Sequence, residues 1–158
     1  MRYKFTPFQI GQEENISKLV RKVYDEYVAP DYSKEGNEFF YNWISPERIA
    51  NRQKEQLNLF TASFGTELVG MIEIRENKNI SLLFVDKEHQ GKGIAKQLFK
   101  IALDDCLNKE ESLDKFYVHA SPYSIPAYQR LGFIKCGEMK EEHGIKYLPM
   151  ELNLKSIK

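Results

Sequence analysis

The stretch that most constrains the fold is residues 80–96, in which an apolar run is followed by a polar turn, two glycines and an amphipathic pattern. The apolar run predicts a buried strand, and the pattern after the glycines predicts a helix. Because Gly91 and Gly93 lack a Cβ atom, their backbone can bring successive N–H groups around an anion. The first turn of a helix adds unpaired N–H groups and the positive end of the helix dipole. The sequence therefore predicts a phosphate-binding turn between a strand and a helix.

The residues around the two glycines exclude the commonest phosphate loops. A dinucleotide-binding turn requires a third glycine or alanine where Lys96 stands, and a Walker loop requires Ser or Thr where Gly93 stands. The segment Gln90-Gly91-Lys92-Gly93-Ile94-Ala95 instead resembles the Gln/Arg-x-x-Gly-x-Gly/Ala signature of the GCN5-related N-acetyltransferase (GNAT) superfamily. In that family the turn holds the pyrophosphate of acetyl-CoA, so the resemblance implies acetyl-CoA as co-substrate.

A second segment, residues 121–133, carries the same resemblance. It is typical of a loop, a short helix and a glycine stop, and Tyr128, Gly132 and Phe133 resemble the Tyr-x-x-x-Gly-Phe element of GNAT enzymes. The resemblance implies that Tyr128 is the general acid for the leaving thiolate, and a phenol with a pKa of about 10 is protonated at neutral pH. The alternative is a tyrosine that is only packed and hydrogen-bonded. Ser121 stands where the family often has an asparagine that contacts the cofactor.

Length and charge restrict the class of protein. The 158 residues suit one domain with a sizeable core, and the resemblance implies a single N-acetyltransferase domain over residues 1–158. The 23 Lys and Arg residues balance the 23 Asp and Glu residues, and no long basic run offers a nucleic-acid surface. A secretory leader pattern and a bilayer-spanning apolar stretch are both missing, so we expect a cytoplasmic protein without a membrane partner.

The cysteines and histidines do not form a pattern of metal ligands. Cys106 and Cys136 are expected on a helix and on a strand as reduced thiols. Together with His89, His119 and His143 they lack the close pairs that a zinc site shows, so no metal is predicted. The sequence also lacks a Gly-x-Ser-x-Gly elbow, which argues against a serine hydrolase.

The order of expected elements is typical of an α/β protein. Strands are expected at 3–8, 57–63, 68–75, 80–85 and 116–119, and helices at 16–27 (capped by Asn15), after Ser45-Pro46, at 94–107 and at 124–131, with two C-terminal strands divided near Gly144. Two helices would thus precede the three-stranded meander, separated by a looser stretch at 29–36. The GNAT resemblance implies a central mixed, mostly antiparallel sheet that is splayed between its fourth and fifth strands, with helices on both faces.

The resemblance also implies how the cofactor is held. Its pantetheine would pair with free backbone groups of Phe84 and Val85, and the N–H of Val85 would stabilise the oxyanion. Lys92 and Lys96 could reach the phosphates, or could simply belong to a solvated helix face with Lys100. The cofactor-binding residues are therefore expected to be Phe84, Val85, Gln90, Gly91, Lys92, Gly93, Ile94, Ala95, Lys96, Ser121 and Tyr128.

The general base has two candidates besides a chain of water molecules. Glu73 alternates with apolar neighbours on a predicted strand, and His119 ends the next strand after the cofactor helix. Each residue could equally be structural, as a salt-bridged sheet carboxylate or a hydrogen-bonded histidine. We expect transfer of an acetyl group to a primary amine of a small molecule by direct attack on the thioester.

The acceptor is the least constrained part of this expectation. The acidic stretch 25–38 would attract a cationic amine, although a solvated loop explains the same residues, and the aromatic residues at 39–43 form either core or an acceptor wall. A protein or peptide amine, a longer acyl-CoA and a non-catalytic acyl-CoA sensor are the alternatives. A homodimer is also open, because relatives of this kind often pair.

Overall fold

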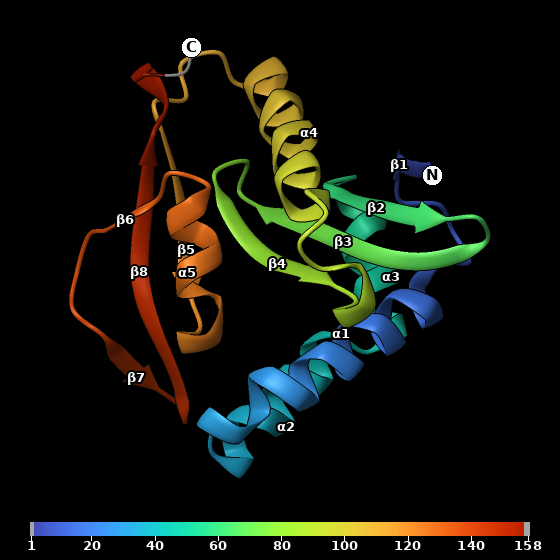
Figure 1. The fold of residues 1–158 in the computed structure, drawn as a ribbon, viewed down its shortest axis with the longest axis horizontal. Helices are drawn as coiled ribbons and strands as arrows, with labels where there is room; N and C mark the ends of the chain where they lie inside the picture. The colour runs from blue at the N-terminus through green and yellow to red at the C-terminus, as the bar shows by residue number, and fades with distance from the viewer. Residues whose placement is uncertain (1, 157–158) are drawn as a thin grey trace.

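The computed structural model describes residues 2–156, in which helices cover both faces of an eight-stranded sheet (Figure 1). The strands are β1 (Tyr3–Pro7), β2 (Leu59–Phe64), β3 (Glu67–Arg75), β4 (Asn79–Val85), β5 (Lys115–Ala120), β6 (Ile134–Lys135), β7 (Lys140–Glu142) and β8 (Ile145–Asn153). Their order is β1-β2-β3-β4-β5-β8-β6, with β7 paired to β8. Within residues 2–156, β4 and β5 are the only strands that pair in parallel. The expected mixed, mostly antiparallel sheet is confirmed.

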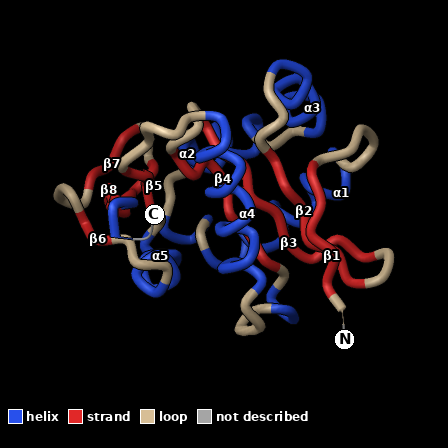
Figure 2. The backbone as a smooth tube through the Cα atoms, turned by 90° about the horizontal axis from the view of Figure 1, so that it is seen from above, coloured by secondary structure: helices blue, strands red, loops and turns tan. Residues whose placement is uncertain are grey.

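The helices lie on opposite faces of this sheet. They are α1 (Glu13–Tyr27), α2 (Lys34–Trp43), α3 (Pro46–Glu55), α4 (Ile94–Lys109) and α5 (Ile125–Arg130), with 3₁₀ turns η1 (Ala29–Asp31), η2 (Lys87–His89), η3 (Pro122–Ser124) and η4 (Leu154–Ser156). Helices α1, α2 and α3 cover one face, whereas α4 and α5 lie on the other (Figures 1 and 2). Among residues 2–156, no helix has both the length and the apolar character needed to cross a membrane.

Capping residues explain where the early helices begin. The Ser45 hydroxyl accepts from the N–H of Arg48 at 3.4 Å, as the Ser45-Pro46 pair predicted. The prediction that Asn15 caps the first helix is wrong, because α1 already begins at Glu13. Three α-helices rather than two precede β2, because Ser33 caps α2 within the stretch that was expected to be loose.

The C-terminal part contains one strand more than predicted. Strand β6 has only two residues, too few to show the alternation from which a strand is recognised. Cys136 therefore follows a short strand and is exposed instead of lying within one. Cys106 is buried in α4 as expected, and burial raises the pKa of its thiol to about 12.

The sheet divides between β4 and β5, which confirms the expected splay. Only Asn79 with Tyr117 and Ile80 with Val118 are paired between these strands. Beyond Ile80 the strands separate, and in Figure 1 β5 and β8 stand upright while β4 runs obliquely away from them. The remainder of β4 therefore has a backbone edge that no strand covers.

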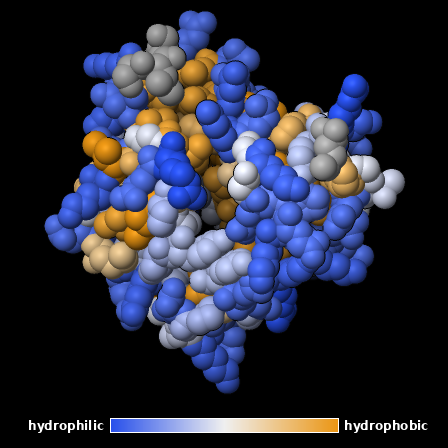
Figure 3. Space-filling view, in the orientation of Figure 1, coloured by the Kyte–Doolittle hydropathy of each residue, from blue (hydrophilic) through white to orange (hydrophobic). Residues whose placement is uncertain are grey.

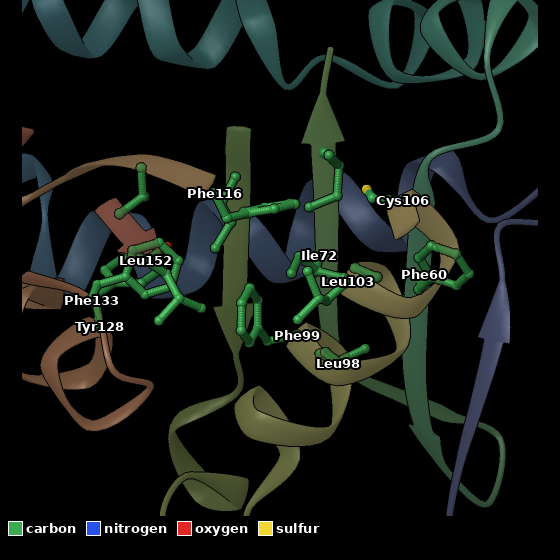
Figure 4. Packing of buried hydrophobic residues seen from close by; sticks show 14 of the residues in the cluster. Phe60, Ile72, Leu98, Phe99, Leu103, Cys106, Phe116, Tyr128, Phe133 and Leu152 are labelled. Carbon is green, nitrogen blue, oxygen red and sulfur yellow. The ribbon is translucent and has the colours of Figure 1, made fainter. Parts of the chain in front are cut away.

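Helix α4 joins the two halves of the sheet where the hydrogen bonds end. Its Phe99 ring lies 5.7 Å from that of Phe116 in β5 and 5.5 Å from that of Phe133, measured between centroids (Figure 4). These rings belong to one buried cluster with the apolar faces of β2, β3 and β4. Helix α4 therefore packs against both halves of the sheet, and its contact with the β5 side is aromatic.

Candidate active site

The separated strands leave a cleft of about 550 Å³. Its walls come from β4, the turn before α4, the end of β5 and α5, and from one side of α1 and α2. In the space-filling view the molecule is hollowed near the centre of this face, where apolar residues show (Figure 3). The cleft thus has a half beside the glycine turn and a half beside α1 and α2.

The glycine turn has the backbone that an anion cradle requires. Gly91 and Gly93 have φ angles of +78° and +81°, in the left-handed region that disfavours other residues. A Cβ atom at either position would meet nothing within 4 Å, so the glycines serve the backbone conformation and not a close approach. No side chain of residues 2–156 caps α4, so its first N–H groups, those of residues 94–96, remain available. These groups fit the diphosphate of acetyl-CoA.

Positive charge lines this half of the cleft. Lys96 on α4 and Arg130 on α5 both line it, and no Asp or Glu side chain among the described residues does. Lys92 is exposed and lies outside the lining, so the expectation that it faces the phosphates is not supported. Arg130 was not expected, because the sequence motif around Tyr128 specifies only the tyrosine, the glycine and the phenylalanine.

Gln90 ties the end of β4 to the opposite wall. Its Nε2 donates to the Val85 carbonyl at 3.0 Å, and its Oε1 accepts from the Tyr123 hydroxyl at 3.3 Å. Tyr123 in turn stacks on Tyr27 of α1, with ring centroids 4.4 Å apart. The side chain of Gln90 therefore shapes the cleft entrance, and its backbone leads into the glycine turn.

The backbone edge of β4 is specified by its pairing with β3. The N–H of Asp86 donates to the Val69 carbonyl at 2.8 Å. Since hydrogen-bonded and non-hydrogen-bonded pairs alternate in an antiparallel ladder, Phe84, two residues earlier, also directs its N–H and C=O towards β3. The expectation that Phe84 offers free backbone groups is therefore wrong, although its side chain lines the cleft. The groups that face the gap are those of Leu83 and Val85.

Tyr128 lies in the cleft with its ring enclosed. The residue is 5% exposed, and its ring meets the edge of Phe133 at 5.6 Å between centroids (Figure 4). Every fully buried polar side-chain atom of residues 2–156 has a hydrogen-bond partner, yet the Tyr128 hydroxyl has none among them. The hydroxyl must therefore reach the open space of the cleft. Burial raises the pKa of Tyr128 above its ordinary value, so the hydroxyl is protonated at neutral pH.

His119 and Ser121 reach the same cleft from the end of β5. The imidazole of His119 stacks on the Tyr147 ring at 4.2 Å between centroids. Partial burial, followed by the positive charge of Arg75, lowers the pKa of His119 below its ordinary value, so the ring is neutral at pH 7. The Ser121 hydroxyl lies 2.9 Å from that of Ser124, which leaves it able to form further hydrogen bonds.

Glu73 does not lie in the cleft, which removes it as a candidate base. Its side chain is 2% exposed on the face of β3 that packs against α3. Arg52 contacts both carboxylate oxygens at 2.9 and 3.0 Å, and Gln53 donates to one of them at 3.0 Å. Glu73 therefore fixes α3 to the sheet, the structural role that was the alternative.

The other half of the cleft is aromatic. Tyr24, Tyr32 and Phe40 line it, and the rings of Tyr24 and Phe40 stack at 3.8 Å. From the predicted aromatic cluster Phe40 thus reaches the site, whereas Phe39 points away and is 59% exposed. Tyr24 lies within the helix predicted at 16–27, and its place in the cleft wall was not predicted, because spacing alone does not distinguish a cleft wall from the core.

The acidic stretch 25–38 is solvated, the alternative that the sequence left open, and it does not form an acceptor wall. All five of its carboxylates are exposed, and none lines the cleft. Asp25 and Glu26 are paired with Arg21 at 3.6 Å and Lys87 at 3.5 Å. In the part of the chain that the structure describes, no group of three or more His, Cys, Asp or Glu side chains could hold a metal ion.

The splayed sheet and the glycine turn before α4 are features of the class of acyl-CoA-dependent N-acyltransferases. The chain belongs to the family of acetyltransferase (GNAT) domains, which it matches over residues 28–154. The predicted family, its use of acetyl-CoA and the enzyme class are thereby confirmed.

Known proteins of this family are similar to the chain in sequence or fold. Spermidine N(1)-acetyltransferase from Vibrio cholerae is 34% identical over 86 residues, which is 48% of this chain and 47% of that protein. A GCN5-related N-acetyltransferase from Rhodopseudomonas palustris has a TM-score of 0.80 at 18% identity, covering 98% of this chain and 97% of its own. PaiA N-acetyltransferase from Thermoplasma acidophilum, solved with coenzyme A, has a TM-score of 0.74 at 21% identity, covering 97% and 99%. The match to the curated relative spans about half its length.

Proposed function

We propose that this chain, as one domain, transfers the acetyl group of acetyl-CoA to the primary amine of a small molecule. The observation that carries the proposal is the cleft itself, which joins an anion-binding turn, an open strand edge, Tyr128 and His119. The similarity to a spermidine acetyltransferase supports a small amine as acceptor. Acetyl-CoA, when bound, supplies the acyl group as an activated thioester.

Three groups of the protein would hold this co-substrate. The N–H groups at the start of α4, together with Lys96, suit the diphosphate. The edge of β4 at Leu83 suits the amides of pantetheine. At Val85 the carbonyl is taken by Gln90, and the N–H is the donor that could stabilise an oxyanion. Because these groups are fixed by the sheet and the helix, they need little rearrangement to bind.

Tyr128 and His119 would handle the protons. Since burial raises the pKa of Tyr128, full transfer of its proton to a thiolate, whose conjugate acid has a pKa of about 8.5, is unfavourable. Tyr128 is therefore assigned as a hydrogen-bond donor that stabilises the departing thiolate. His119 is neutral at pH 7 and lines the cleft, so it can accept a proton from the acceptor amine directly or through water.

The test is a panel of small amines with acetyl-CoA, in which thiol release is measured and the products are identified by mass. Acetylation of a small amine supports the proposal. Acetylation of only a peptide N-terminus or a lysine side chain would show that the acceptor is a protein or peptide amine and not a small molecule. Tight CoA binding without turnover of any amine would favour an acyl-CoA sensor and refute the proposed transferase activity.

A further inference from the structure

We infer that the acceptor is an amine on an apolar or aromatic body that carries no second positive charge. This inference rests on the proposed function and concerns the half of the cleft beside α1 and α2. The lining residues from α1, α2 and the segment between them are apolar and aromatic, and the basic residues of the cleft come from α4 and α5.

Aromatic rings form the wall of this half and are fixed in place. Tyr24 is 1% exposed, and its ring lies between Phe40, stacked at 3.8 Å, and Tyr32, edge-on at 6.0 Å. The Tyr24 hydroxyl donates to Asn37 at 2.7 Å, so it is already engaged. Val23 of α1 and Val28, which follows the last residue of that helix, complete the wall. Such a surface favours a flat or branched apolar group.

The charges of the cleft disfavour a polyamine. Lys96 and Arg130 are the lining residues with a full charge, and no carboxylate of residues 2–156 lines the cleft. The acidic residues next to lining residues along the chain lie outside the lining themselves. Asp25 is exposed and paired with Arg21, Asp31 is exposed to solvent, and Asp86 is paired with Lys22. A second ammonium group in this half would therefore be desolvated without a counter-charge, which is costly.

The far end of this half is closed by a contact between α2 and the β7–β8 turn. The N–H of Ser33 donates to the Gly144 carbonyl at 3.0 Å. Tyr32, which precedes Ser33, and Ile145, which follows Gly144, line the cleft. The approach is tight, since a Cβ atom on Gly36 would lie 2.7 Å from the Gly144 carbonyl oxygen. A long flexible chain would have to break this contact to extend further.

The test compares 2-phenylethylamine with spermidine as acceptors. We expect kcat/KM for 2-phenylethylamine to exceed that for spermidine by about tenfold or more. Replacing half-buried Tyr32 in the lining, Tyr32→Glu, should shift this ratio towards spermidine by about tenfold, because it supplies the missing counter-charge. Phe39→Glu adds the same charge on α2 outside the cleft, and it should leave the ratio unchanged.

The outcomes separate this inference from the proposed function. Equal or better use of spermidine by the unaltered protein would overturn the inference while the transferase activity stands. If no amine is acetylated, calorimetry of each amine with the CoA-saturated protein tests the inference. Tighter binding of 2-phenylethylamine than of spermidine supports the inference, and equal or weaker binding refutes it. Should Tyr32→Glu fail to fold in a thermal melt, the ratio in the unaltered protein remains the deciding measurement.

Discussion

Replacing Tyr128 by phenylalanine should separate chemistry from stability. The hydroxyl has no hydrogen-bond partner among residues 2–156, and the ring keeps its edge contact with Phe133 in the variant. Since no hydrogen bond within the protein is lost, we expect the free energy of unfolding to change by less than about 1 kcal/mol. The affinity for CoA should stay the same, because the diphosphate and pantetheine contacts lie on α4 and β4.

The rate of thiol release should fall far more. Loss of one preorganised donor to a developing negative charge costs about 10²- to 10³-fold in kcat, which corresponds to about 2.7–4 kcal/mol. The measurements are thiol release under saturating substrates, urea unfolding, and calorimetry with CoA. Tyr117→Phe is the matched control, because Tyr117 also lies on an element beside the splay but outside the cleft lining.

Two results would refute this reasoning. An unchanged kcat in Tyr128→Phe would remove the hydroxyl from the chemistry. A loss of stability of several kcal/mol together with weaker CoA binding would show that the residue acts mainly through packing.

Three further changes probe the rest of the structure. Gly93→Ala places a Cβ atom on a left-handed residue, at a cost of about 1–2 kcal/mol. We therefore expect calorimetry to show about tenfold weaker binding of CoA. An unchanged Kd would argue against the turn as the phosphate site. Glu73→Gln removes the charge that Arg52 pairs with, which should lower the free energy of unfolding in urea by about 3 kcal/mol while kcat is retained; a stable but inactive variant would restore Glu73 as a base. The pKa of His119 is lowered, so its neutral base form is lost only as the pH falls through that lowered value. The acid limb of the pH profile of kcat should therefore lie below pH about 6.5, and it should disappear in His119→Gln. An unaltered profile in the variant would exclude His119 as the base.

The sequence was most informative where local chemistry decides the structure. The two glycines after an apolar strand predicted the turn, and Ser45-Pro46 predicted the start of α3, because each depends on nearest neighbours. Strand β6 and helix α2 were not predicted. Strand β6 is formed by its pairing with β8, which lies later in the chain. Helix α2 begins after Ser33 in a polar stretch that has no helical periodicity of apolar residues.

The side chains of the site were less predictable, because their direction depends on partners far away in the chain. Glu73 faces α3 and not the cleft, since Arg52 and Gln53, consecutive residues of α3 that lie about twenty positions earlier in the chain, contact that face of β3. Likewise, the backbone direction of Phe84 follows from the register of β3 with β4, which one residue of slip would reverse.

The uncovered stretch of β4 gives the molecule an edge strand in the interior of its own sheet. Exposed edges invite pairing with strands of other chains. Here the gap lies between β4 and β5 beside α4, and Gln90 already occupies the Val85 carbonyl, so this acceptor is not open to a foreign strand. In the function that we propose, a slender ligand with amide groups along its length takes the place that a strand would have filled and bridges the two halves of the sheet.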